Sequence, residues 1–275
     1  MDYIEISITN FTGFEPEIAI AELAELGFES FTETESGIQC YVSVDNYREE
    51  PVIGYLDQIC VEHGLKYTVG RIAAQNWNAL WESAYESVVI AGKCRVRAPF
   101  HAPATDLPYE IIIEPRMSFG TAHHETTSLM LELLMTETVN GKRVLDMGCG
   151  TGVIAILAHK MHAAGVIAID NDEWAYSNAL DNMVKNDASE VTVLMGGAET
   201  IPGGGFDIII ANINRNVLLE DIPAYAGHLH SGGTLLLSGF YEEDLEQITD
   251  ACRKSGLEYA AHKSDNRWVG ARFVK

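Results

Sequence analysis

The chain has 275 residues, of which 47% are hydrophobic and 21% are charged. This length and composition exclude a mainly disordered chain and predict about two domains, each with a buried core. Forty acidic residues against 18 basic ones give a net charge of -22. Such a surface repels phosphate groups, which argues against naked nucleic acid as a ligand and favours a basic partner.

Neither export nor membrane insertion is indicated by the sequence. Residues 1–10 contain acids where a signal peptide has basic residues, and no apolar run is long enough to cross a bilayer. The five cysteines are widely spaced and form no Cys-x-x-Cys pair, which argues against a disulfide framework and a zinc site. We therefore expect a cytoplasmic protein without a metal and without a membrane partner.

The acidic residues are concentrated at the front of the chain. Residues 1–70 contain 14 acidic and two basic residues, a net charge of -12, whereas the other 205 residues carry -10. This asymmetry predicts a short acidic unit and a longer, more balanced unit with a different task.

Residues 1–73 predict a small α+β domain. Apolar residues alternate at Ile4, Ile6 and Ile8 as in a half-buried strand, and Pro16 is a favourable helix start. The expected strands are 3–9, 31–34, 38–44 and 65–72, and the expected helices are 16–26 and 52–63. The order strand, helix, strand, strand, helix, strand is that of a ferredoxin-like domain. That plan serves many unrelated functions.

Residues 74–90 predict a linking helix, which contains Trp77 and Trp81 at helical spacing. The simpler interpretation is that these rings pack against one or both domains, and the alternative is that they stack on a ligand. After the helix, residues 94–98 and 109–114 are expected to pair as a hairpin.

Residues 91–275 predict a doubly wound, Rossmann-like α/β domain. Helices and strands alternate, and continuous apolar strands such as Ile208–Ile210 and Leu235–Leu237 are typical of strands buried on both faces. The expected strands are 143–147, 166–170, 191–195, 206–211, 234–238, 257–262 and 268–274. The pattern predicts a mostly parallel sheet covered by helices.

The sharpest motif is a strand-to-helix turn that contains Gly148, Gly150 and Gly152. Open α/β sheets bind ligands at such turns, where glycines allow close approach and the helix offers free N–H groups. A dinucleotide fingerprint requires a third glycine at position 153, which is valine here. The spacing therefore argues against a dinucleotide-dependent oxidoreductase.

Two acids accompany this turn. We expect Asp146 to point its carboxylate into the crevice, where it would repel a diphosphate and attract a cationic, amino-acid-like ligand. The alternative for Asp146 is a cap of the following helix. Asp170 ends the next strand, where an acid accepts hydrogen bonds from ribose hydroxyls. Together these features match S-adenosylmethionine and resemble the cofactor turn of class I methyltransferases.

The fourth strand of this domain ends at Asn212, beside the same crevice. Its amide oxygen can accept an N–H bond from an amine and orient it toward a methyl donor. The ending resembles the Asn-Pro-Pro-aromatic signature of amino-group methyltransferases, although Ile213, Asn214 and Arg215 replace its last three residues. The alternative is that Asn212 only forms a turn.

A polar segment before the first helix of the domain is more specific. Residues 119–127 read Phe-Gly-Thr-Ala-His-His-Glu-Thr-Thr. They resemble the Phe-Gly-Thr-Gly-x-His-x-Thr-Thr segment of the ribosomal protein L11 methyltransferase family and depart from it only at Ala122. Trp268 and the two-domain layout also fit that family, so the resemblance covers essentially the whole chain.

The resemblance implies an S-adenosylmethionine-dependent protein methyltransferase. Its substrate would be the N-terminal α-amine and the lysine ε-amines of ribosomal protein L11, which the small domain recognises. We expect no direct nucleic-acid partner and a monomer. The residues expected to bind the cofactor are Thr127, Gly148, Asp170 and Asn212 by the resemblance, with Phe119 and Gly120 lining the pocket, and Asp146 and Gly150 by the glycine motif.

Methyl transfer needs no protein nucleophile, but the amine must first lose its proton. A lysine with its reference pKa of about 10.4 is almost wholly protonated at neutral pH, and burial in an apolar pocket lowers that pKa. We expect Asn212 to orient the amine, with His124 as the rival candidate for a general base. The alternative for His124 is that it hydrogen-bonds and shapes its loop.

Other interpretations stay open. The enzyme class allows a different protein or a small-molecule amine as substrate. A cofactor-binding RNA-interaction protein is disfavoured, because residues 1–70 contain only Arg48 and Lys66 as basic residues. Glu199 lies either near the adenine of the cofactor or in a solvated loop.

Overall fold

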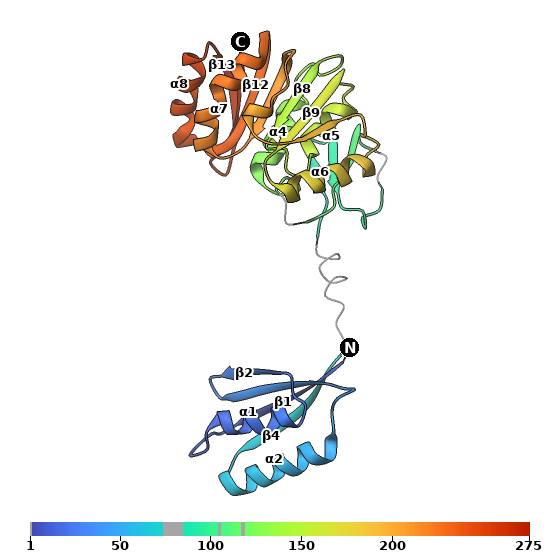
Figure 1. The fold of residues 1–275 in the computed structure, drawn as a ribbon, viewed down its shortest axis with the longest axis vertical. Coiled ribbons are helices and arrows are strands. Elements are labelled where there is room, and N and C mark those ends of the chain that lie inside the picture. The colour runs from blue at the N-terminus through green and yellow to red at the C-terminus, as the bar shows by residue number, and fades with distance from the viewer. Residues whose placement is uncertain (1, 74–84, 104–105, 117–118) are drawn as a thin grey trace. The chain divides into compact units, whose positions relative to one another are not determined.

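The computed structural model describes residues 2–73, 85–103, 106–116 and 119–275. The chain divides into two compact units, residues 1–84 and 85–275 (Figure 1). Trp77 and Trp81 of the expected linking helix lie outside the described residues. The end of that helix was predicted wrongly, because Val88–Ile90 form strand β5 of the second unit.

The first unit is an antiparallel four-stranded sheet with two helices. Its elements are β1 (Tyr3–Thr9), α1 (Pro16–Glu25), β2 (Ser30–Thr34), β3 (Gly37–Ser43), α2 (Glu49–His63) and β4 (Lys66–Ile72). The strand order is β2-β3-β1-β4 and every pair is antiparallel, which confirms the ferredoxin-like plan. Its core joins alternate strand residues such as Ile6 and Ile8 to Leu23 of α1 and Leu56 of α2.

The second unit contains a seven-stranded, mostly parallel sheet. Its strands are β8 (Arg143–Met147), β9 (Gly165–Asp170), β10 (Thr192–Met195), β11 (Phe206–Asn212), β12 (Leu229–Tyr241), β13 (Glu258–Asp265) and β14 (Trp268–Val274). The strand order is β10-β9-β8-β11-β12-β14-β13, and β14 runs antiparallel to both of its neighbours. The predicted doubly wound sheet is therefore confirmed.

Helices cover both faces of this sheet, so each face has its own core. The helices are α4 (Glu125–Leu134), α5 (Val153–Lys160), α6 (Glu173–Lys185), α7 (Arg215–His228) and α8 (Leu245–Lys254). The first three pack on one face and the last two on the other. In β11, Ile208 and Ile210 belong to one core and Ile209 to the other. The strand order reverses between β8 and β11, which is where such sheets bind ligands.

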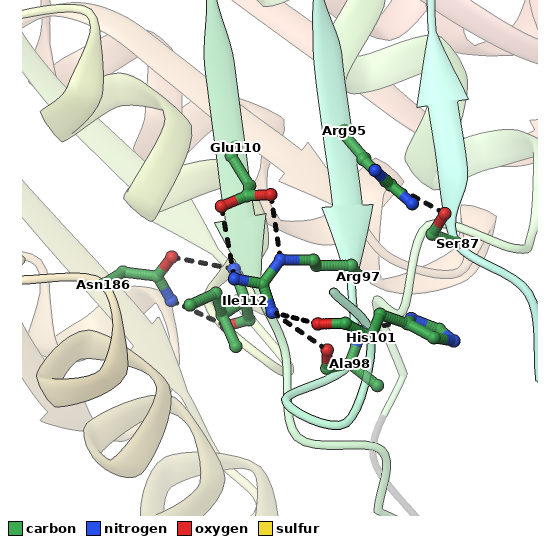
Figure 2. A network of polar contacts seen from close by, with 8 residues as sticks. All are labelled: Ser87, Arg95, Arg97, Ala98, His101, Glu110, Ile112 and Asn186. Carbon is green, nitrogen blue, oxygen red and sulfur yellow. Dashed lines mark hydrogen bonds and ion pairs between the residues drawn. The ribbon is translucent and has the colours of Figure 1, made fainter. Parts of the chain in front are cut away.

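A three-stranded sheet precedes the seven-stranded one. It consists of β5, β6 (Cys94–Arg97) and β7 (Tyr109–Ile112), and β6 and β7 are parallel rather than the hairpin that we predicted. Strand pattern alone does not encode direction. A partly buried ion pair joins the two strands, because Arg97 Nε lies 2.9 Å from a carboxylate oxygen of Glu110 on the neighbouring strand (Figure 2).

No helix in the described ranges combines the length and apolarity needed to cross a bilayer.

Candidate active site

A cleft of about 640 Å³ lies at the carboxyl ends of the central parallel strands. It is lined by all the predicted site residues except Asp146: Phe119, Gly120, His124, Thr127, Gly148, Gly150, Asp170 and Asn212. These residues come from four separate parts of the sequence, and the topology of the sheet brings them together. The cleft therefore lies at the point where the strand order reverses.

The glycine turn is shaped by close contacts within the protein. Gly148 and Gly150 have φ angles of 64° and 54°, a region that favours glycine. A Cβ on Gly150 would lie 2.4 Å from the carbonyl oxygen of Phe119, and one on Gly148 would lie 2.2 Å from Cγ2 of Ile213. Glycine is thus required at both positions because two other segments of the cleft approach the turn closely. We had predicted only that these glycines give access to a ligand.

Asp170 connects the end of β9 to this turn. Its carboxylate is only 9% exposed and accepts the N–H of Gly150 at 2.8 Å and that of Asp172 at 3.0 Å. Each carboxylate oxygen has further lone pairs, so these bonds fix the side chain without using all its acceptor capacity. Asp170 can therefore also accept hydrogen bonds from a pair of ribose hydroxyls.

Asp146 does not point into the cleft, so this part of the prediction was wrong. Side chains of β8 alternate between the two faces of the sheet, and Asp146 shares the face of Val144, toward α5. Its Oδ2 accepts the N–H of Ala155, in the first turn of α5, at 3.1 Å. The helix-capping alternative describes this contact.

The second oxygen of Asp146 is unusual. Oδ1 is buried and has no hydrogen-bond partner among the described residues. Complete burial raises the pKa of Asp146 to about 7, the N–H of Ala155 opposes this shift, and the negative charge of Asp170 adds to it. A positively charged group near this carboxylate would compensate a buried charge that the protein itself does not neutralise.

Asn212 stands at the last position of β11, paired in register with Ser238 of β12. Its side chain lines the cleft, and its amide makes no hydrogen bond to another side chain in the part of the chain that the structure describes. The neighbouring Ile213 is held against Gly239, where a Cβ would lie 2.0 Å from the Ile213 carbonyl oxygen. The strand end is thus fixed in place while the Asn212 amide stays available to a ligand.

His124 is the N-cap of α4. Its Nδ1 accepts the N–H of Thr126 at 3.3 Å and lies 2.9 Å from the Thr126 hydroxyl. A neutral ring whose Nδ1 accepts carries its proton on Nε2, so it has no free lone pair for an amine proton while the cap is formed. Its ring also meets that of Trp268 in an edge-to-face contact, with centroids 4.9 Å apart. The geometry favours the loop-shaping alternative for His124.

Several residues that line the cleft were not predicted from the sequence. Asn171, Asp172 and Ala175 form the link from β9 into α6, where the Asp172 carboxylate accepts the N–H of Ala175 at 2.8 Å. The pattern of an acid three residues before a helical N–H could have identified Asp172 as a cap. Trp268 also lines the cleft, a role in the site that we did not predict.

Glu199 does not line the cleft. Its carboxylate is exposed and accepts the N–H of Gly197 at 2.9 Å, a bond that lowers the pKa of Glu199. The solvated-loop alternative therefore describes this residue. Within the described ranges, no group of three or more His, Cys, Asp or Glu side chains is placed to hold a metal ion.

The residues of the cleft fit S-adenosylmethionine. Asp170 is suited to the ribose, and the apolar side chains of Val153, Ile154 and Ala175 are suited to a flat base. Outside the cleft lining, the buried Oδ1 of Asp146 has no hydrogen-bond partner among the described residues. A diphosphate would meet two carboxylates and, in the described part of the cleft, no Lys or Arg side chain.

Comparison with known proteins gives matches along nearly the whole chain. The family model described as "Ribosomal protein L11 methyltransferase (PrmA)" matches residues 9–275. A ribosomal protein L11 methyltransferase of Porphyromonas gingivalis is 45% identical over 261 residues, which cover 94% of this chain and 90% of that protein. One of Phocaeicola vulgatus is 39% identical over 279 residues, which cover 100% of this chain and 99% of that protein.

Two solved structures share the fold of this chain. A ribosomal protein L11 methylase from Lactobacillus delbrueckii subsp. bulgaricus superposes with a TM-score of 0.65 at 26% identity, over 70% of this chain and 99% of that one. A methyltransferase from Pyrococcus furiosus, with a TM-score of 0.51 at 20% identity over 60% of this chain and 88% of that one, shares the fold.

Proposed function

The chain belongs to the ribosomal protein L11 methyltransferase family, a family of S-adenosylmethionine-dependent enzymes, and we propose that it methylates amino groups of ribosomal protein L11. The amines are the N-terminal α-amine and lysine ε-amines. The observation that carries the proposal is the position of Asn212, whose unpaired amide shares one cleft with Asp170 and the glycine turn.

The cofactor would be held at three points of the cleft. The Asp170 carboxylate would accept hydrogen bonds from the ribose, the turn at Gly148 and Gly150 would face the amino-acid portion, and Phe119, Gly120 and Thr127 would line the adjoining part of the pocket. The cofactor supplies an electrophilic methyl group on a sulfonium. This chain therefore needs to position two reactants and not to provide a nucleophile.

Asn212 would orient the substrate amine. Its amide oxygen accepts an N–H bond and so directs the nitrogen lone pair toward the cleft. Burial in the partly apolar cleft lowers the pKa of the incoming amine, which favours the neutral, nucleophilic form. His124 acts as a structural residue, because its Nδ1 is used in capping α4.

The first unit would recruit the substrate. Residues 1–70 carry a net charge of -12, which complements a basic protein and repels nucleic acid. We therefore propose that the enzyme meets L11 as a protein, without direct contact to RNA, and that it acts as a monomer. A ribosomal protein as substrate places the reaction in the cytoplasm.

Intact-mass analysis of purified L11 tests this function. L11 is incubated with the enzyme and S-adenosylmethionine, with Asp170→Ala as the matched inactive variant. We expect mass increments of whole methyl groups with the unaltered enzyme and none with the variant. No increment, together with calorimetric binding of S-adenosylmethionine, would discard L11 in favour of a different protein or small-molecule amine.

A further inference from the structure

Phe119 and Gly120 line one side of the cleft, the Phe119–Gly120 wall, at the end of the segment 114–120 that leads from β7 toward α4. The structure describes residues 114–116, 119 and 120 of this segment. The side chain of Phe119 is 89% exposed, so packing in a core does not hold this wall. Its position depends on hydrogen bonds of the backbone.

Thr151 of the glycine turn makes those bonds at the far end of the segment. Its N–H donates to the carbonyl oxygen of Phe119 at 3.0 Å, and its hydroxyl donates to that of Gly120 at 2.6 Å. Thr151 is completely buried. The wall is thereby attached directly to the turn that we assign to the cofactor.

A single side chain, Asn182 of α6, joins the near end of the segment to the same residue. Its Oδ1 accepts the N–H of Glu114 at 3.0 Å, and its Nδ2 donates to the carbonyl oxygen of Thr151 at 3.0 Å. Asn182 is 0% exposed, and both of its polar atoms are satisfied. One amide therefore fixes the start of the segment and the residue that holds its end.

Other contacts between α6 and this segment are weaker. Arg116 pairs with Asp181 at 2.8 Å and Lys185 with Glu114 at 3.3 Å, but these side chains are between about one third and one half exposed. Ion pairs at such a surface contribute little. Because Asn182 is buried, water cannot replace the hydrogen bonds of its amide when they are lost.

The next asparagine along α6 offers a natural comparison. Asn186 is 5% exposed and makes the same kind of bonds to a strand, because its Oδ1 accepts the N–H of Ile112 at 2.8 Å and its Nδ2 donates to the Ile112 carbonyl at 2.6 Å (Figure 2). It makes no hydrogen bond to the glycine turn or to residues 119 and 120 among the described residues. Asn182 and Asn186 thus share a helix face, burial and chemistry, and they differ in their link to the cleft.

We propose that Asn182, acting through Thr151, is a positioning residue for S-adenosylmethionine binding. It sets the distance between the Phe119–Gly120 wall and the glycine turn, and it does so without touching the cofactor. This inference rests on the cofactor dependence of the proposed function and not on the identity of the methylated substrate.

Calorimetric titration of S-adenosylmethionine into the full chain tests the inference, with Asn182→Ala compared to Asn186→Ala. Each variant loses three hydrogen bonds, because Asn182 Nδ2 also donates to Oδ1 of Asn178 at 3.3 Å and Asn186 Nδ2 also donates to the carbonyl oxygen of Asn182 at 2.8 Å. Their Tm values should therefore fall by similar amounts. We expect the Kd for S-adenosylmethionine to rise about tenfold in Asn182→Ala and less than about threefold in Asn186→Ala. Equal changes in Kd would overturn the positioning role.

A second variant keeps the inference testable if Asn182→Ala folds poorly. Thr151→Val retains the backbone bond to Phe119 and removes only the hydroxyl bond to Gly120, so it should also weaken S-adenosylmethionine binding. Hydrogen exchange of the cofactor-free chain should show faster exchange over residues 114–120 in Asn182→Ala, and unchanged exchange relative to Asn186→Ala would contradict the inference. Absence of S-adenosylmethionine binding by the unaltered chain would instead overturn the cofactor assignment. Hydrogen exchange needs no cofactor, so it tests the role of Asn182 even in that case.

Discussion

The two units of this molecule place their functional groups in opposite ways. The distinctive property of residues 1–70 is their net charge of -12, which is carried by acidic side chains that are mostly exposed. The only basic residues in this range are Arg48 and Lys66. In the second unit the important groups are few and largely buried, with Asp146 and Thr151 at 0% exposure and Asp170 at 9%. We therefore propose that the first unit acts through its summed charge and the second through individual residues.

This difference determines how each unit responds to substitution. A charged surface loses its effect gradually, because each exposed charge contributes a small, salt-screened share. A cleft built from buried hydrogen bonds fails at single positions, because each missing partner leaves a buried group unsatisfied. The substitutions below test this contrast.

The largest effect is expected for Asp170→Ala. The change removes the carboxylate that we propose as the ribose acceptor, and it leaves the N–H groups of Gly150 and Asp172 without their acceptor. We expect the Kd for S-adenosylmethionine to rise about 1,000-fold, measured by calorimetry. Glu190→Ala, at an exposed acid of the same unit, should leave the Kd unchanged. A Kd for Asp170→Ala near that of the unaltered chain would show that this buried position is no more sensitive to substitution than an exposed one.

Asn212→Ala should mainly reduce the rate of methyl transfer. The side chain lines the cleft at the end of β11, and we assign it to the amine. We expect kcat to fall about 100-fold, with a smaller change in the Kd for S-adenosylmethionine. Asn216→Ala, at an exposed asparagine in the first turn of α7, is the matched control. A larger effect on Kd than on kcat would assign Asn212 to the cofactor alone.

Asp146→Asn should change the pH dependence of stability. The folded-state pKa of Asp146 is raised to about 7 by burial, above an unfolded value of roughly 3.9. At pH values between these two pKa values, the folded chain holds a proton on Asp146 that the unfolded chain has lost. The free energy of unfolding therefore falls as the pH rises toward 7.

The neutral asparagine can still accept the N–H of Ala155, so the variant removes this loss. We expect Asp146→Asn to have a Tm several degrees above that of the unaltered chain at about pH 8, with a difference that shrinks as the pH falls and is small at about pH 4. Its affinity for S-adenosylmethionine should fall, because a compensating negative charge is gone. Thermal unfolding without cofactor across this range checks the prediction, and parallel Tm profiles for the two chains would contradict it.

The smallest effect is expected in the first unit. Replacing Glu17, Glu22 and Glu25, all exposed, by glutamine removes three negative charges without altering the core. We expect kcat/KM for L11 to fall about two- to threefold at low salt, with a smaller difference at high salt. The same replacement at three exposed acids of the second unit is the control: Glu190, Glu246 and Glu258. An equal fall in both variants would show that the charge acts through the whole molecule.

Sequence patterns predicted both folds because each pattern has a direct physical cause. Alternation at Ile4, Ile6 and Ile8 marks a sheet with one buried face, and the continuous run Ile208–Ile210 marks a strand covered by helices on both sides. The direction of β7 was not predictable in this way, because a short apolar strand carries no signal for parallel or antiparallel pairing.

The site was predictable where a residue acts by its place in a motif. Asp170 and Asn212 end strands of the central sheet, and topology brings strand ends together. Asp146 was misplaced because its orientation depends on which face of β8 it occupies. The role of Asn182 was not visible, since a polar residue within a helix does not reveal which distant backbone groups it will meet.

The central claim is that the methyl group is transferred to amino nitrogens of L11. Its most direct test uses S-adenosylmethionine with an isotopically labelled methyl group and locates the label on L11 by peptide mass spectrometry. We expect label only on the N-terminal α-amine or on lysine ε-amines, and none with Asp170→Ala. Label on carboxylate, thiol or hydroxyl groups, or on RNA in an assembled ribosome with none on L11, would contradict it.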